Sequence, residues 1–337
     1  MMLLLCGIFP VVPIDFAVLL PALALLALLL DALLGEPARW HPLVGFGRWA
    51  AWLEKRLNRS AAGVVSIFCG TLALLLALAP LLLVVAALLW LAQQSLWLWL
   101  LAEVVLLYLC IGWHSLQLHI GWVSQALLAG DLAQAREKLG WIVSRDTQQL
   151  NNDEVAQAGI ESLLENSADS LFVSLFWFAI GGSTLALLHR WVNTLDAMWG
   201  YRSERYEFFG KVAARLDDLL AFIPARLTAL VMALASGRYC LRAMQCWRTQ
   251  AAACASPNGG PVMTTGAGAL GIRLSERACY QGEWKAKPPM GCGPAAGVSD
   301  MAPALSLVWR ALGLWLLLWL LGGLLLNWLQ YGVVYVT

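Results

Sequence analysis

The sequence predicts an all-α integral membrane protein, a polytopic helical bundle with polar cytosolic helices and a Gly/Pro-rich loop. Three observations lead to this fold class. The 337-residue chain is 60% hydrophobic, and its mean hydropathy is +0.70. Only 13% of its residues are charged, whereas soluble domains have about 25%. Several apolar runs approach or exceed the ~20 residues that a helix needs to cross a bilayer.

The first region, residues 1–113, is expected to hold a membrane helix, a cationic loop and a helical hairpin. Phe16–Leu34 is long enough to span the hydrocarbon layer. From Ala61 to Trp113 the chain is apolar, and the break Gln93-Gln94-Ser95 divides it into two arms. The positive-inside rule assigns the loop between these segments to the cytoplasm, because it carries Arg39, Arg48, Lys55, Arg56 and Arg59.

Glu103 lies inside the second arm of that hairpin. An ionisable group at such depth is costly unless it faces the interior of a bundle, so a functional role is the default interpretation. The alternative is a position near a helix end.

Three further regions follow. Residues 114–236 are expected to form polar helices and embedded segments that carry the catalytic motifs, with a turn at Ala129-Gly130-Asp131. Residues 237–303 form a Gly/Pro-rich cytosolic region without periodic pattern between Ser256 and Gly297, and residues 304–337 a C-terminal transmembrane helix. If Leu171–Leu188 and Leu219–Ser236 both cross the bilayer, the cations between them face outside, against the positive-inside bias. Segments that are re-entrant or packed inside the protein resolve this conflict.

A stripe of carboxylates marks the polar region. On a helix, Glu154, Glu161 and Glu165 fall within a narrow sector of one face, and Asp169 would follow if the helix continued. Stacked like charges repel unless a cation lies among them, and carboxylate oxygens suit Mg²⁺. The competing interpretation is a solvated helix face.

A second charged cluster lies between the two apolar segments. Guanidinium groups bind carboxylate or phosphate in a bidentate manner, and neighbouring acids hold a metal or orient the guanidiniums. The alternative is a set of juxtamembrane charges that extend to the interface. The cluster comprises Asp196, Tyr201, Arg202, Arg205, Tyr206, Lys211, Arg215, Asp217 and Asp218.

Other motifs are weak. Gly266 to Gly271 match G-x-G-x-x-G, but no strand precedes them in a βαβ context. The eight cysteines and four histidines show no zinc spacing, and we interpret the cysteines as reduced apolar side chains. A net charge of +1 offers no basic field, so we expect no nucleic acid partner.

The assembled motifs resemble the cobinamide-phosphate synthase family of cobalamin biosynthesis, the CobD/CbiB family. The blocks that carry this resemblance are D-x-x-L-G-E-P-x-R-W-H-P-L-V-x-F-G from Asp31, W-I-V-S-R-D-T-Q-Q-L from Trp141, E-S-L-L-E-N-S-A-D-S from Glu161, V-N-T-L-D-A-M-W-G-Y from Val192, A-R-L-D-D-L-L-A-F-I-P-A-R-L from Ala214, S-P-N from Ser256 and A-G-A-L-G-I from Ala267. The chain departs from the family pattern at Leu274-Ser275-Glu276 and at Cys292, and mildly at Glu36. We therefore assign no role to the loop Ser275–Gly297.

The resemblance implies a multi-pass enzyme of the bacterial inner membrane with its active site facing the cytoplasm. It would join adenosylcobyric acid to (R)-1-aminopropan-2-ol or its O-phosphate as an amide, with ATP and Mg²⁺. Other membrane-associated enzymes of the pathway are further candidate partners.

Each chemical demand of that reaction indicates a set of residues. Activating the acid needs charge neutralisation, and attack needs a deprotonated amine. Candidate metal ligands are Glu161, Glu165 and Asp169, and candidate catalytic acids and bases are Asp146, Asp217 and Asp218. Candidate groups for substrate or phosphate are Arg145, Asn166, Asp196, Tyr201, Arg202, Arg226, Ser256 and Asn258. We expect Arg226 to pair with Asp217 or Asp218.

Two other functions are compatible with the sequence. A corrinoid transporter or carrier would use Glu103 and Arg226 to line a path, but the polar residues gather in interfacial blocks. A non-catalytic signalling relative would be favoured by degraded acidic motifs, and these motifs are intact.

Overall fold

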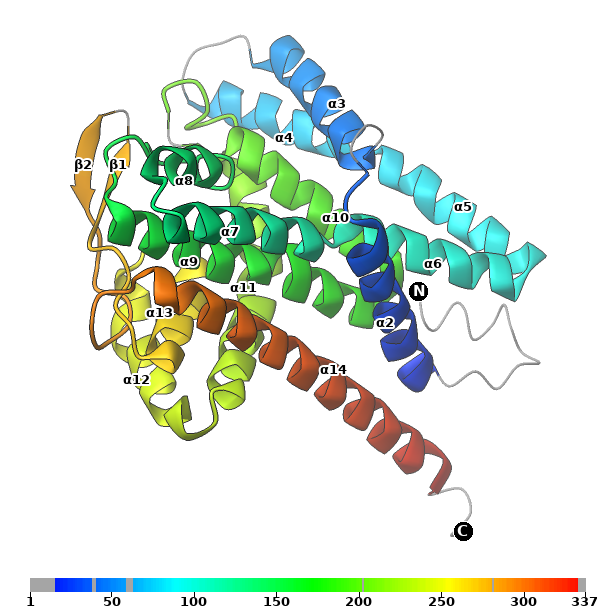
Figure 1. Cartoon of the computed structure of the whole chain (residues 1–337). Coiled ribbons are helices and arrows are strands. Elements are labelled where there is room, and N and C mark those ends of the chain that lie inside the picture. Colours follow the sequence, from blue (N-terminus) through cyan, green and yellow to red (C-terminus); the bar gives the residue numbers. More distant parts are fainter. Residues whose placement is uncertain (1–15, 38–40, 59–62, 202, 281, 333–337) are drawn as a thin grey trace. The chain divides into compact units, whose positions relative to one another are not determined.

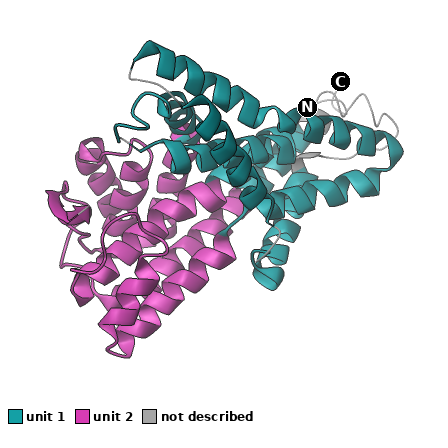
Figure 2. Ribbon diagram, turned by 90° about the horizontal axis from the view of Figure 1, so that it is seen from above, with its two compact units in different colours: residues 1–112, 173–221, 319–337 teal, residues 113–172, 222–318 magenta. Residues whose placement is uncertain are grey.

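The computed structural model describes residues 16–37, 41–58, 63–201, 203–280 and 282–332, and it is almost entirely helical (Figure 1). Its contacts divide the chain into two compact units (Figure 2). Unit 1 comprises residues 1–112, 173–221 and 319–337, and unit 2 comprises residues 113–172 and 222–318. The expected all-α membrane fold is confirmed. Arg39, Arg59 and Arg202 lie outside the described residues.

Unit 1 consists of apolar helices. The helices that lie wholly within it are α2 (Phe16–Leu34), α3 (Pro42–Leu57), α4 (Val64–Leu78), α5 (Pro80–Gln94), α6 (Leu96–Cys110) and α10 (Val173–Trp199). It also holds the first part of α11 (Lys211–Ala235) and the last part of α14 (Met301–Gly332). Helix α6 packs against α2, α5 and α10.

Unit 2 is built around α9 (Asn152–Ser167), which continues through a π-helical turn, η1 (Ala168–Phe172). Helix α9 packs against α7 (Trp113–Leu128), α8 (Leu132–Leu139) and α13 (Gly259–Leu270). Unit 2 also holds the last part of α11 and the first part of α14. Its other elements are α12 (Cys240–Gln250), the strands β1 (Arg277–Tyr280) and β2 (Glu283–Ala286), and the short turns η2 (Gly237–Tyr239), η3 (Ala251–Ala253) and η4 (Val298–Asp300).

Several expected boundaries are confirmed. The first helix occupies Phe16–Leu34, and the hairpin breaks at Ser95, whose backbone is extended between α5 and α6. The turn at Gly130 is also present, because Gly130 has a φ of 76° and Asp131 caps α8 through Gln134 N. Local signals of helix termination therefore located these ends correctly.

The Gly/Pro-rich region, expected to be a folded or mobile loop, contains regular secondary structure. It contains the buried helix α13 and an antiparallel hairpin that pairs Arg277 with Ala286 and Tyr280 with Glu283. The glycines of the G-x-G-x-x-G match allow close helix packing: Gly266 faces Leu164, Gly268 faces Cys246, and Gly271 ends α13 in the left-handed conformation with a φ of 73°. Because small residues occupy every face of α13, its sequence shows no helical period of hydrophobic residues.

Helix α10 is broken in its interior. Gly181 and Gly182 have non-helical backbone angles, and the buried Glu103 on α6 accepts a hydrogen bond from Ser183 N at 2.7 Å. The Glu103 carboxylate thus caps the half-helix that begins after the break, where the helix dipole favours an anion. This contact gives Glu103 a structural role within unit 1.

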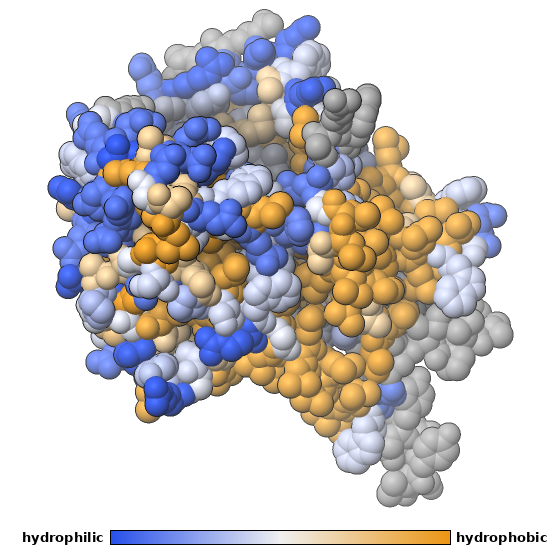
Figure 3. Space-filling model, in the orientation of Figure 1, coloured by the Kyte–Doolittle hydropathy of each residue, from blue (hydrophilic) through white to orange (hydrophobic). Residues whose placement is uncertain are grey.

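Among the described residues, five helices are long and apolar enough to cross a membrane: Val64–Gln94, Leu96–Leu128, Asn152–Trp199, Lys211–Ala235 and Val298–Leu329. Large apolar side chains are exposed on α14, where Leu317, Leu318, Leu321 and Leu325 face outward. Figure 3 shows such hydrophobic surface as broad continuous areas. Exposed apolar surface of this extent is typical of contact with lipid. Re-entrant segments stay a prediction.

Gly266→Ala should destabilise the packing of α13 on α9. The new Cβ would lie 2.6 Å and 2.7 Å from the two δ-methyl carbons of buried Leu164, and overpacking of this kind costs about 1–3 kcal/mol. Gly121→Ala in α7 is the matched control, because nothing lies within 4 Å of its Cβ position. The thermal unfolding midpoint should fall for Gly266→Ala and hold or rise for Gly121→Ala; equal midpoints would contradict the assigned packing.

Candidate functional site

Helix α9 carries the site and has a well-defined start. Asn151 Oδ1 accepts from Glu154 N, and Glu154 Oε2 accepts from Asn151 N, both at 2.9 Å. This capping box fixes the first turn. From Val155 to Leu164 every side chain of α9 is buried, which includes Glu161 at 1% exposure. A charge in such a place requires compensation.

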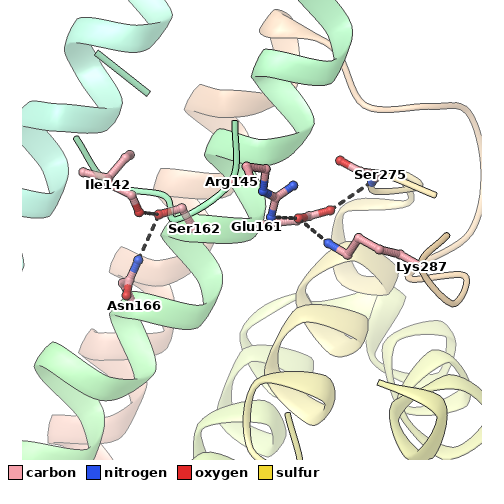
Figure 4. A network of polar contacts seen from close by, with 7 residues as sticks. All are labelled: Ile142, Arg145, Glu161, Ser162, Asn166, Ser275 and Lys287. Atoms are coloured by element: carbon pink, nitrogen blue, oxygen red, sulfur yellow. Dashed lines mark hydrogen bonds and ion pairs between the residues drawn. The ribbon is translucent and has the colours of Figure 1, made fainter. Parts of the chain in front are cut away.

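Two cations compensate Glu161 (Figure 4). Arg145 Nη2 donates to Glu161 Oε2 at 2.5 Å, and Lys287 Nζ donates to the same oxygen at 2.6 Å. The other oxygen, Oε1, accepts from Ser275 N at 3.0 Å. Glu161 therefore joins a loop before α9 to the segment that flanks the hairpin.

Glu165 lies one turn further along α9 in a different setting. Within the described part of the chain its carboxylate makes no hydrogen bond and no ion pair. It approaches the start of α13 so closely that a Cβ at Gly259 would overlap Glu165 Oε1. Two carboxylates one turn apart thus differ in their partners, since Glu161 accepts directly from Arg145 and Lys287, whereas Glu165 is only within electrostatic reach of them.

The hairpin is fastened by two more acids of the polar region. Asp146 Oδ2 accepts from Gly282 N at 2.8 Å, and Asp146 N donates to Cys279 O at 2.9 Å. Glu154 Oε1 accepts from Arg277 Nη2 at 2.7 Å. These contacts give Asp146 a role in holding the hairpin to the loop that carries Arg145.

Asn166 supports the same loop. Its Nδ2 donates to Ser162 Oγ at 2.9 Å, and Ser162 Oγ donates to Ile142 O at 3.0 Å (Figure 4). This chain of hydrogen bonds connects α9 with the backbone three residues before Arg145. Asn166 therefore supports the loop that carries Arg145.

The start of α13 brings together three of the predicted binding residues. Ser256 Oγ accepts from Gly259 N at 2.9 Å, and Arg226 Nη1 donates to Asn258 Oδ1 at 3.2 Å. Arg226 also donates to Phe222 O at 2.7 Å, and its guanidinium lies over the Phe222 ring. The expected pairing of Arg226 with Asp217 or Asp218 is wrong: Pro224 does not end α11, and the guanidinium turns toward the loop before α13.

The expected magnesium ligands do not fit a protein-held ion. The contacts with Arg145, Lys287 and Ser275 N occupy both oxygens of Glu161. In the described ranges no group of three or more His, Cys, Asp or Glu side chains is arranged for a metal. Asp169 lies in the π-helical turn η1. The requirement for Mg²⁺ stays a prediction, and we derive no step through it.

The remaining predicted site residues belong to unit 1. The carboxylate of Asp196, near the end of α10, interacts electrostatically with the carboxylates of Asp217 and Asp218 in α11. Arg190 interacts in the same way with Asp217. Tyr201 is exposed. The pKa of His41 lies below its ordinary value, mainly because the side chain is partly buried. The negative charge of Glu36 raises this pKa, and the positive charge of Arg190 lowers it. No contact tests the catalytic and binding roles that the sequence suggested for these acids.

Sequence reasoning missed Lys287 and Ser275, which lie in the segment to which no role was assigned. Lys287 is 126 residues from Glu161. Its only local signal is a cation directly before Pro288-Pro289, which fixes the backbone after the hairpin. A contact between residues so far apart in the sequence becomes visible only in the folded structure.

Comparison with known proteins decides the family. The family model described as CobD/Cbib protein matches residues 24–308. The chain belongs to the CobD/CbiB family. A Chromobacterium violaceum protein named "Cobalamin biosynthesis protein CobD" is 48% identical over 90% of this chain and 96% of its own length. A protein of the same name from Stutzerimonas stutzeri is 52% identical over 88% and 96% of the two chains.

Another such relative, from Geobacter metallireducens, is 39% identical over 80% of this chain and 86% of its own. No solved structure matches. Membership of the CobD/CbiB family makes the chain a membrane protein of cobalamin biosynthesis.

Glu161→Gln should destabilise the protein far more than Glu154→Gln. The first change leaves Arg145 and Lys287, whose side chains are only 12% and 19% exposed, without their counterion, and breaking a buried pair costs about 3–5 kcal/mol. The partner of Glu154, Arg277, is 57% exposed, so its loss costs under about 1 kcal/mol. Glutamine also preserves the capping box. Denaturant unfolding in detergent measures both; equal losses would contradict the central place of Glu161.

Proposed function

We propose that the protein ligates adenosylcobyric acid to (R)-1-aminopropan-2-ol or its O-phosphate in an ATP-dependent amide-forming reaction. Family membership supports the pathway, and the site of unit 2 supports the chemistry. An amide does not form from a carboxylate and an ammonium ion in water, because the acid needs a leaving group and the amine a free electron pair.

The observation that carries this proposal is the contrast between Glu161 and Glu165. Two titratable groups placed in opposite environments have different roles in many active sites. Glu161 accepts from two cations and stays ionised, so it organises its surroundings. Glu165 accepts no hydrogen bond from a described residue and is half-buried, which suits a group that accepts a proton during the reaction.

The proposed reaction has two steps. A carboxylate oxygen of the corrinoid attacks the γ-phosphorus of ATP, which releases ADP and leaves an acyl phosphate. The ammonium group of the amino alcohol transfers a proton to Glu165, and the neutral nitrogen attacks the acyl carbon. The C–O bond to phosphate then breaks, and phosphate departs with the electron pair and takes the second proton from the nitrogen as the amide forms.

Cys254, which lies beside these glutamates, does not offer a nucleophile for a covalent intermediate. Burial raises the pKa of its thiol; Lys287 lowers it, and Glu165 and Glu161 raise it further. A thiol whose pKa lies above its ordinary value is protonated at neutral pH and is a weak nucleophile. Direct attack by the amine on the activated acid is therefore the simpler path.

Glu165→Gln tests the proposed base. The amide keeps the shape of the side chain but cannot accept the proton, so kcat for amide formation should fall by about 10²–10⁴-fold. The assay supplies adenosylcobyric acid, aminopropanol phosphate, Mg²⁺ and ATP to purified protein and follows the corrinoid product. Because Glu165 makes no ion pair with a described residue, the unfolding midpoint should change little. Full activity in this variant would remove Glu165 from the mechanism, and an active wild type that consumes no ATP would refute the ligase.

Gly259→Ala provides a second test that leaves every functional group in place. The added methyl overlaps Glu165 Oε1 and approaches Ser256 Oγ to 3.1 Å, so the carboxylate has to move. A displacement of about 1 Å at a reacting group is expected to lower turnover by ~10²-fold. The matched control is Gly121→Ala, which meets no neighbour. Equal turnover in the two variants would contradict a role for the position of Glu165.

A further inference from the structure

We propose that Arg145 and Lys287, held side by side by Glu161, form a binding site for a phosphoryl group. The proposed ligation bears on this inference only through the identity of the molecule that carries that group. Lys287 lies in the segment where the chain departs from its family pattern, and no sequence motif had assigned it a function.

The spacing of the two cations suits one oxyanion. Arg145 Nη2 and Lys287 Nζ lie 2.5 Å and 2.6 Å from the same oxygen, Glu161 Oε2, so they are no more than about 5 Å apart. Two donors at this separation can each reach an oxygen of one phosphate at the usual 2.7–2.9 Å of charge-assisted hydrogen bonds. Without Glu161 the two like charges would repel each other.

The two cations also retain unused donors. Within the described residues Arg145 donates only through Nη2, which leaves Nε and Nη1 free, and Lys287 Nζ donates only to Glu161. Both side chains remain partly exposed, at 12% and 19%, whereas Glu161 is closed off at 1%. Arg145, Lys287 and Glu161 together therefore carry one net positive charge, and the two cations are more exposed than the acid that holds them.

Neighbouring contacts keep this arrangement rigid. Lys287 N donates to Glu276 O at 2.8 Å, directly beyond the paired strands of the hairpin. Asp146 fastens the same hairpin next to Arg145. The two cations are thus supported by one connected set of backbone contacts, as a site that binds without reorganisation requires.

Binding of inorganic phosphate to the purified full-length protein tests the site directly, by calorimetry at constant ionic strength with acetate as the comparison anion. Lys287→Met should weaken phosphate binding by about tenfold or more, since a charge-assisted hydrogen bond is lost. Lys287→Arg should restore it to within a few-fold. Lys285→Met is the matched control, because Lys285 lies on the same hairpin but is exposed, and its ammonium group lies over the Tyr280 ring rather than at a carboxylate.

The carrier of the phosphoryl group follows from steady-state kinetics of the same variants. A rise in KM for aminopropanol phosphate in Lys287→Met, with KM for ATP unchanged, assigns the site to the amino alcohol, and the reverse assigns it to the nucleotide. Unchanged phosphate binding and unchanged KM values in folded Lys287→Met would overturn the proposal while leaving the ligase intact. Selective loss of phosphate binding in a protein that forms no amide would uphold the site and refute the ligase.

Discussion

The buried carboxylate of Glu161 is the constraint on which the rest of unit 2 depends. An ion at 1% exposure is tolerated only when its hydrogen-bonding positions are filled by charged or polar partners. Arg145, Lys287 and Ser275 N fill them. Because these groups come from both sides of α9 in the sequence, satisfying one side chain forces the loop before α9 and the hairpin after α13 to meet. The arrangement of the candidate site follows from that requirement.

The acids near Glu161 in the sequence stabilise different parts of unit 2. Asp146 fixes the hairpin turn, and Glu154 both caps α9 and pairs with Arg277. Their removal would loosen the hairpin without exposing a buried ion. Glu165 makes no such contact with a described residue, so acids that look alike in the sequence have different surroundings in the fold.

The sequence predicted helices and charged faces well because both depend on local spacing. The stripe of Glu154, Glu161 and Glu165 lies on one helix, and the break at Ser95 divides the hairpin as expected. The partners of Glu161 could not be predicted from local spacing, because Ser275 and Lys287 are 114 and 126 residues away from it in the sequence. Helix α13 escaped detection because a helix surrounded on all sides has no amphipathic period. The pairing of Arg226 failed for a related reason, as Asn258 becomes a neighbour only after folding.

The contact between Glu103 and Ser183 bears on how the chain is made. Ser183 follows Glu103 by 80 residues, so a ribosome adding about 5–20 residues per second completes the donor on the order of ten seconds after the acid. During this interval α6 has to enter the membrane with an ionisable group that still lacks this backbone donor. The many leucines and tryptophans of α6, LWLWLLAEVVLLYLC, favour membrane insertion and offset the free-energy cost of inserting Glu103. The apolar excess of this helix thus serves its biogenesis as well as its final packing.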